Sequence, residues 1–164
     1  CGQGPYREML ENLVNKNGLQ NTVIFLGFVK NPYSVSKKCD VFVFPSMHEG
    51  LPNALIENMI CGLPVIATDF KSGAREILAP DTDFKYQVKD SIEQAEYGII
   101  TPICSGNQKL VNEELEKEEN LLADAMLKMV ENNEYRRYYG EQARKRAQDF
   151  AIEKQVEQWL RILE

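Results

Sequence analysis

Two glutamates flank a tight turn in the segment "SMHEGLPNALIENMICGLP", which runs from residue 46 to residue 64. Glu49 precedes the turn, and Glu57 lies a turn or more inside the helix that the turn opens. A carboxylate in the position of Glu57 can accept hydrogen bonds from two neighbouring hydroxyl groups, as on a ribose. The reacting group would then lie near Glu49. The spacing suggests a nucleotide-linked ligand.

The turn between the two glutamates offers a site for an anion. Gly50 lets the backbone turn closely, and Pro52 presets φ for the start of the helix. The free N–H groups around Leu51, Asn53 and Ala54 should point outward, and the helix dipole attracts negative charge to the same place. We therefore expect phosphates to bind at the start of this helix.

A simpler interpretation explains the same two glutamates. The second can be a solvated helix residue, and the first an acid that complements the helix dipole. For an arbitrary spacing of this kind, the simpler interpretation is favoured. The spacing by itself therefore does not identify a site.

Strands and helices alternate along the chain on either side of this turn. Apolar runs rich in β-branched and aromatic residues predict strands at 22–28, 41–45, 64–68 and 98–101. The run at 41–45 is continuous, as expected for a strand buried on both faces. Alternation of this kind predicts an α/β fold, a Rossmann-like parallel sheet with helices on both faces. Ligands of such sheets bind at the carboxyl ends of the strands, where the opening segment lies.

The second half of the chain is expected to be mostly helical. Residues 81–96 are polar and aperiodic and predict an inserted loop. Helices are expected at about 112–132, 134–149 and 152–163. The whole chain, residues 1–164, is interpreted as one domain.

Composition excludes several functions. The 164 residues carry a net charge of −6, so no basic field attracts nucleic acid. No apolar run is long enough to cross a bilayer. The four cysteines form no CxxC pair, and the single histidine, His48, is not at ligand spacing from any of them. We expect no metal and no cofactor, and reduced thiols in a cytoplasmic protein.

The stretch "CDVFVFPSMHEGLPNALIENMICGLPVIATDFKSGAREIL" resembles the signature segment of the family 4 (group 1) glycosyltransferases, which have the GT-B fold. The resemblance extends upstream to "GQGPYREMLENLVNKNGLQNTVIFLGFV" and downstream to "YGIITP" and "YRRYYGEQARKRAQDFAIEKQVEQW". The motifs GxGP, FLGxV, Pro-Ser, E-x7-E, CGLPVIATD and SGxxE follow in the expected order. The segment near 81–96 is the main interruption.

The resemblance implies a role for the chain and for several of its residues. The chain would be the C-terminal domain, which holds the nucleotide-sugar donor. Glu49 would contact the donor sugar as the catalytic residue, and Glu57 would bind the ribose hydroxyls. The donor would also lie along the residues at the turn and near the base, which are Gly50, Leu51, Pro52, Asn53, Gly27, Phe28 and Val29. Such enzymes retain the anomeric configuration and generally need no metal.

Three further residues, His48, Gly73 and Arg75, are weaker candidates for the site. His48 precedes the first glutamate and can touch the acceptor, although a loop histidine without a catalytic task is the favoured interpretation. Arg75 follows Gly73 near a helix start, where it can approach a phosphate. A surface ion pair with a nearby acid is the simpler interpretation for this arginine.

The chain departs from the family at its start. A first strand, a Gly-Arg turn and a Lys-Gly segment would precede "CGQGP" in the family, and the acceptor-binding N-terminal domain is missing too. We therefore expect an N-terminally truncated fragment of a longer enzyme, inactive by itself. The expected donor is UDP-linked, with GDP and ADP open, and the expected acceptor is a saccharide or lipid-linked.

The sequence leaves an alternative open for the function of the protein and another for its location in the cell. The alternative to an enzyme of polysaccharide biosynthesis is a nucleotide-binding or interaction module without catalysis. The basic run from Arg136 to Arg146 is interpreted as the solvated face of an amphipathic helix. A peripheral role at the inner face of the membrane is the less favoured alternative.

Overall fold

The computed structural model describes residues 2–107 and 113–163. Its centre is a sheet with the strand order β1-β2-β4-β3, in which β3 is antiparallel and the other strands are parallel. The strands are β1 (Phe42–Phe44), β2 (Val65–Thr68), β3 (Glu93–Gln94) and β4 (Ile99–Thr101). The helices are α1 (Arg7–Lys16), α2 (Tyr33–Ser36), α3 (Asn53–Ile60), α4 (Ala74–Leu78), α5 (Lys117–Glu131), α6 (Asn133–Ala147) and α7 (Ile152–Leu163).

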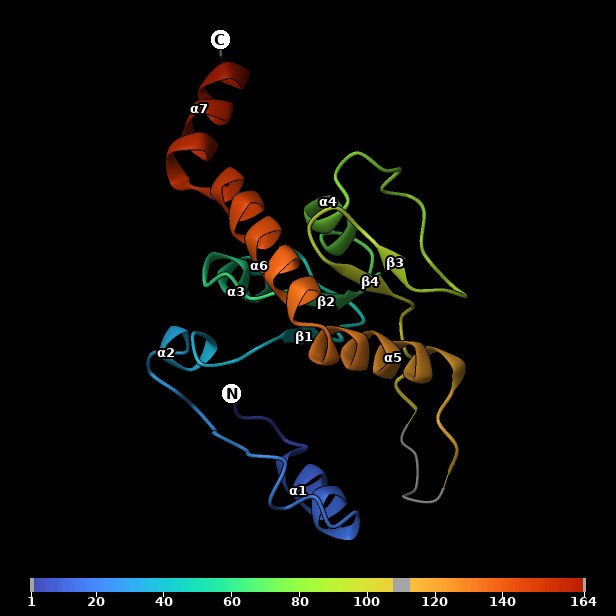
Figure 1. Ribbon diagram of the computed structural model, residues 1–164. Helices are drawn as coiled ribbons and strands as arrows, with labels where there is room; N and C mark the ends of the chain where they lie inside the picture. Colours follow the sequence, from blue (N-terminus) through green and yellow to red (C-terminus); the bar gives the residue numbers. More distant parts are fainter. Residues whose placement is uncertain (1, 108–112, 164) are drawn as a thin grey trace.

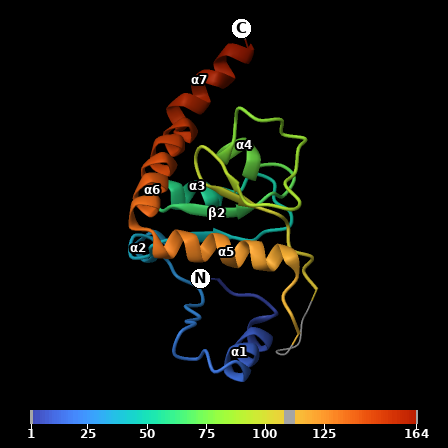
Figure 2. The ribbon, with the colours of Figure 1, turned by 45° about the vertical axis from the view of Figure 1, so that its right-hand side comes forward.

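Helices cover both faces of the sheet, as the alternating pattern predicts. Val65 and Ala67 of β2 pack into a cluster with α3, α4 and α6, whereas Ile66 packs into a second cluster with α5 and α6. Successive side chains of a strand point to opposite faces, so the two clusters lie on opposite sides of β2. Figure 2 shows α5 on one side of this strand and α3 and α4 on the other.

Helix α6 comes very close to the turn before β2. A Cβ atom at Gly140 would lie 2.7 Å from the carbonyl oxygen of Gly62. Only a residue without a side chain fits at this crossing. The helix contributes Ala143 and Ala147 to the first cluster and Tyr139 to the second.

The predicted strand at 22–28 is wrong. These residues lie in irregular structure, and Ile24 and Phe28 are 77% and 76% exposed. The Gly2 N–H donates to the Gly27 carbonyl at 2.7 Å, the Arg7 side chain donates to the Phe25 carbonyl at 3.4 Å, and the N–H groups of Thr22 and Val23 donate locally to Leu19. A strand needs a partner for its backbone groups, and no strand of the described chain runs beside this segment. It lies with α1 at one end of the molecule, away from the sheet (Figure 1).

The strand at 41–45 forms, but it is not buried on both faces. All three residues of β1 are half-buried. β1 is the edge strand of the sheet, and its outer side faces no other strand in the described ranges. The parallel strand β2 is fully buried, because it has a strand on either side and helices on both faces.

The segment at 81–96 is more than a polar loop. Val88 and Ala95 are buried at 4% and 7% exposure, and Glu93–Gln94 forms the short strand β3 beside β4. Val88 and Ala95 are buried by residues distant in the sequence. The periodicity of the segment itself does not show such contacts.

The C-terminal helices form near the predicted ranges. α5 begins at Lys117 because Glu116 and Glu119 close a capping box there. The predicted start at residue 112 lies outside the described residues. α6 and α7 match the predicted second and third helices closely.

Candidate functional site

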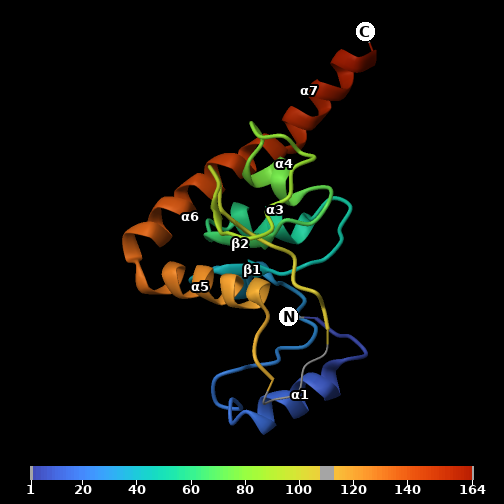
Figure 3. The same cartoon turned by 90° about the vertical axis from the view of Figure 1, so that its right-hand side faces the viewer.

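The loops that follow β1, β2 and β4 meet at the carboxyl edge of the sheet. The hydroxyl of Thr68, at the end of β2, donates a hydrogen bond to the carbonyl of Ser46 in the loop after β1. A Cβ atom at Gly106, after β4, would lie 2.9 Å from Sδ of Met47 in that same loop. In Figure 3 the loops after β1 and β4 lie on the right-hand side of the sheet. This edge is where parallel α/β sheets bind ligands.

Glu49 is held inside the first of these loops. The hydroxyl of Ser46 donates a hydrogen bond of 2.5 Å to Oε1 of Glu49, and the carboxylate side chain is half-buried. The contact fixes one carboxylate oxygen and leaves the other available. The sequence did not predict this bond. The only local signal for it is the serine three residues before the acid in "PSMHE".

The start of α3 differs in part from the expected anion site. The Asn53 N–H donates to the Leu51 carbonyl at 2.9 Å, so it is not free as predicted. The N–H groups of Leu51 and Ala54 donate to no partner within residues 2–107 and 113–163. Pro52 is buried, whereas Leu51 is 62% exposed. Two unbonded N–H groups and the dipole of an eight-residue helix therefore remain for an anion.

Glu57 lies on α3, beyond this turn, and is half-buried. The neighbouring carboxylate of Glu57 raises the pKa of the Tyr33 hydroxyl on α2, through hydrogen bonding and through its negative charge. Tyr33 was not among the site residues that the sequence predicted. No spacing signal could have found it, because α2 and α3 are brought together only by the fold.

Gly73 belongs to the same edge. Its φ of 121° is in the region that favours glycine, and a Cβ atom there would lie 2.6 Å from Cδ of Pro52 and 3.3 Å from the Gly50 carbonyl oxygen. The turn that opens α4 therefore packs directly against the turn that opens α3.

Arg75 does not form the surface ion pair that the sequence favoured. It is 3% exposed and bonds Asp69 at 2.6 Å and Glu93 at 2.7 Å. Burial by itself would lower the pKa of the Arg75 guanidinium, but its bonds to Glu93 and Asp69 raise that pKa above the ordinary value. A buried cation paired with two carboxylates is not available to a phosphate.

The remaining predicted residues are not joined directly to the two glutamates. His48 is exposed on the loop before Glu49. No hydrogen bond or ion pair of the described residues connects residues 27–29 with residues 49–57. Gly27 has a φ of 64°, and a Cβ atom there would lie 3.3 Å from the Arg7 side chain.

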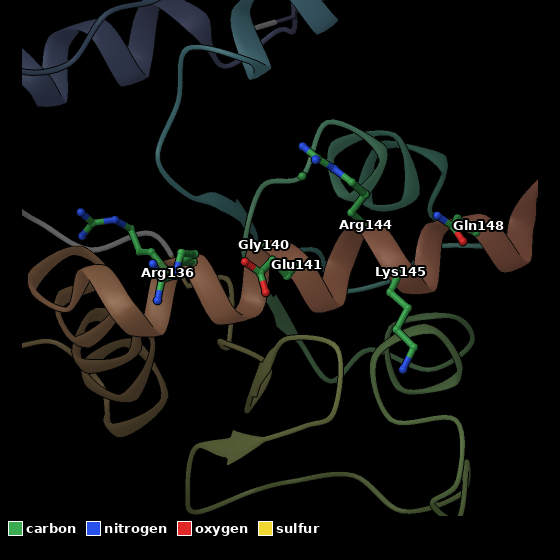
Figure 4. Close-up of a pocket in the computed structure, with 8 residues that line it drawn as sticks. Arg136, Gly140, Glu141, Arg144, Lys145 and Gln148 are labelled. Carbon is green, nitrogen blue, oxygen red and sulfur yellow. The ribbon is translucent and has the colours of Figure 1, made fainter.

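A separate hollow of about 400 Å³ lies at the opposite edge of the sheet (Figure 4). It is bounded by Gly62, which precedes β2, and by residues of α6, namely Arg136, Arg137, Gly140, Glu141, Arg144 and Lys145, with Gln148 just beyond the helix. In Figure 4 Arg144 points toward the loop at Gly62 and Lys145 points the other way. The amino edge of a parallel sheet is not where its ligands bind, so this hollow is not part of the candidate site.

Among the residues that the structure describes, no three of His, Cys, Asp and Glu lie together as metal ligands would. Within the same residues, no helix combines the length and the apolar character that crossing a bilayer requires.

A parallel sheet with helices on both faces, and with its ligand-binding turns at the carboxyl edge, defines the Rossmann-like class. The model of the family "Glycosyl transferases group 1" matches residues 1–146, and the chain belongs to this family. The structure of HepE from Anabaena, solved in complex with UDP, superposes with a TM-score of 0.69 over 94% of this chain and 36% of its own, at 22% identity. The fold is therefore that of the GT-B glycosyltransferases.

Two relatives match nearly the whole chain. An uncharacterized glycosyltransferase of Methanocaldococcus jannaschii is 42% identical over 99% of this chain and 40% of its own length. The N-acetylgalactosamine-N,N'-diacetylbacillosaminyl-diphospho-undecaprenol 4-alpha-N-acetylgalactosaminyltransferase of Campylobacter jejuni is 31% identical over 91% of this chain and 33% of its own. The chain thus spans between a third and two fifths of these relatives.

Proposed function

We propose that the chain forms the donor-binding part of a retaining glycosyltransferase, which moves a sugar from a UDP-sugar to a saccharide or lipid-linked acceptor. The observation that carries the proposal is the arrangement of two carboxylates around the start of α3 at the carboxyl edge of the sheet. Glu49 precedes that start and Glu57 follows it, with the two unbonded N–H groups of Leu51 and Ala54 between them in the sequence.

This arrangement can assist the departure of a nucleoside diphosphate. Negative charge develops on the diphosphate as the bond to the sugar breaks, and the helix start at Leu51 and Ala54 would stabilise it. Glu49, with one oxygen held by Ser46, would place its other oxygen toward the sugar, where positive charge develops. No step of this division of labour needs a metal, and we propose that none takes part.

The other end of the nucleotide would lie on the second glutamate. The carboxylate of Glu57 can accept hydrogen bonds from both ribose hydroxyls. Gly50, Pro52 and Asn53 would line the diphosphate with their backbone, and residues 27–29 would lie toward the base. His48, which is exposed on the loop before Glu49, would lie on the side of the acceptor.

Two of the similar proteins support the choice of donor and acceptor. The Anabaena structure contains UDP, which is consistent with a UDP-linked donor. The name of the Campylobacter enzyme states a saccharide on diphospho-undecaprenol as its substrate. A lipid-linked acceptor would bring the complete protein to the membrane surface, so we propose a cytoplasmic protein with peripheral contact to the inner face, in polysaccharide biosynthesis.

A titration of the complete protein with UDP, GDP and ADP tests the nucleotide. UDP should bind most tightly, and a UDP-sugar should then be consumed only when an acceptor is present. Retention of the anomeric configuration is read from the product by NMR. Nucleotide binding without any transfer would favour the alternative, a non-catalytic nucleotide-binding module. Failure to bind any of the three nucleotides would contradict both.

A further inference from the structure

Arg75 is the centre of a buried network. Its NH1 and NH2 groups donate to the Glu93 carboxylate at 3.0 and 2.7 Å, NH2 donates to Asp69 at 2.6 Å, and NH1 donates to Thr82 at 3.1 Å. The ring of Tyr86 lies with its centre 4.9 Å from the guanidinium carbon. The side chain of Arg75 is 4% exposed, so these bonds form away from water, where ion pairs are least screened.

The network fastens the segment 79–94 to the carboxyl end of β2. Asp69 follows β2 directly, and besides Arg75 it accepts the Val88 N–H at 2.7 Å through its side chain. The Gln87 amide donates to the Asp69 carbonyl at 2.7 Å. The segment 79–94 overlaps residues 81–96, which interrupt the family resemblance, and it is bonded to the edge of the sheet that holds the candidate site.

The same arginine stands next to a strained turn. Ser72 has a φ of 66°, which is uncommon for a residue with a side chain, and Gly73 has a φ of 121°. Such a conformation persists only where the surrounding structure supports it. Asp69 lies before this turn and Arg75 lies after it, so their 2.6 Å ion pair closes the turn from both ends.

The turn is in contact with the start of α3. A Cβ atom at residue 73 would lie 2.6 Å from Cδ of Pro52 and 3.3 Å from the Gly50 carbonyl oxygen, so the space beside Gly73 is already filled by these groups. Closely packed groups transmit displacements to one another. A displacement of the turn would therefore displace Gly50 and Pro52, which set the direction of the Leu51 N–H group.

We propose that Arg75 is a positioning residue of the donor site, through which the segment 79–94 controls nucleotide affinity. Its bond to Asp69 holds the turn at 72–73 against the anion-binding start of α3, and its bonds to Glu93 make that support depend on the segment. The inference rests on the proposed function, because it concerns the affinity of the same site.

The test measures UDP affinity by calorimetry in the complete protein, at a temperature below the unfolding of every variant. Arg75→Met removes the network. Glu93→Ala removes only its outer end, at a side chain that is one quarter exposed, and keeps the pair with Asp69. We expect each to weaken UDP binding by about fivefold or more, the lower end of typical coupling between linked sites. Arg75→Lys should recover part of the loss, because it keeps the cation.

Arg146 offers a matched control at the other end of α4. It donates to the Ile77 and Glu76 carbonyls at 2.9 Å each, so it anchors the same helix without contact to the turn. Arg146→Met should lower the melting temperature and leave UDP affinity unchanged. If Arg146→Met weakens UDP binding as much as Arg75→Met, the effect is general loosening, and the proposal is overturned.

The remaining outcomes separate this inference from the proposed function. Unchanged UDP affinity in Glu93→Ala and in whichever Arg75 variants fold would overturn the positioning role alone. If Arg75→Met does not fold, the UDP affinities of Glu93→Ala and Arg75→Lys decide whether the positioning role holds. If the unsubstituted protein binds none of UDP, GDP and ADP, the proposed function fails, and the inference fails with it.

Discussion

The hydroxyl of Ser46 donates a hydrogen bond of 2.5 Å to Oε1 of Glu49 and, through its own carbonyl, Ser46 accepts a hydrogen bond from Thr68. The glutamate is thus oriented by a residue that is itself fixed to β2. Under the proposed function, a carboxylate positioned in this way would act on the sugar more than on the nucleotide.

Glu49→Ala should therefore lower the rate of sugar transfer by about 100-fold, the usual cost of one electrostatic contact to a transition state. The affinity for UDP should change little. Ser46→Ala should lower the rate less, because the carboxylate stays but loses its orientation. Initial rates and UDP titrations check both variants. Equal losses of rate and of UDP affinity in Glu49→Ala would instead assign this residue to the architecture of the anion site.

Glu57→Ala should weaken UDP binding by about 1.5–3 kcal/mol, the usual contribution of hydrogen bonds to a charged group. Glu57→Gln should cost less, since one acceptor oxygen survives. Glu141→Ala, which removes an exposed carboxylate near the opposite edge of the sheet, controls for net charge. The melting temperature should stay the same in all three. A UDP affinity unchanged by Glu57→Ala would return this residue to the solvated helix face.

Gly73→Ala should destabilise the fold by about 2 kcal/mol, because it places a side chain at a strained φ and against Pro52. UDP affinity should fall as well, since the proline has to move. Gly4→Ala is the control, because the space beside that glycine is open and it lies outside the candidate site. Denaturant unfolding and UDP titration measure the two effects. A Gly73→Ala protein as stable as the unsubstituted one would show that the turn adapts without cost.

Tyr139 should make the fold sensitive to alkaline pH. Burial, followed by the influence of Tyr135, raises the pKa of the Tyr139 hydroxyl above its ordinary value of 10.0. Below pH 10 the hydroxyl keeps its proton in both states, and its contribution to stability is fully present. Above pH 10 the unfolded chain loses the proton and the folded chain does not, so stability falls as the pH rises.

Tyr139→Phe should remove this part of the alkaline loss and keep the packing of the ring. Urea midpoints at pH 8 and pH 11 compare the two proteins. Tyr6→Phe, at a tyrosine that is 61% exposed, is the control for tyrosine number. The expectation fails if unsubstituted protein and Tyr139→Phe lose the same stability between the two pH values.

The sequence predicts the elements that carry their own signals. The strand at 64–68 is a continuous apolar run, and α3 is bounded by Pro52 and Gly62, so both form where expected. The carboxyl edge of the sheet follows from the alternation of strands and helices. The placement of Glu49 and Glu57 on either side of the start of α3 follows from the same pattern.

Other features depend on partners that no local pattern shows. The segment 22–28 has the composition of a strand, but composition does not supply a neighbouring strand for its backbone groups. Arg75 looks like a surface residue because the acid that covers it, Glu93, lies eighteen positions away and reaches it only when the intervening segment folds back. The contact between Tyr33 and Glu57 arises in the same way.

Helix α6 joins the apolar clusters on the two faces of the sheet. It contributes Ala143 and Ala147 to the cluster on one face of the sheet and Tyr139 to the cluster on the other. Neither cluster can open to water without moving this helix, whose crossing at Gly62 and Gly140 leaves no room for a side chain. The two sides of the sheet should therefore melt together, so that a spectroscopic label on either face reports one and the same cooperative transition.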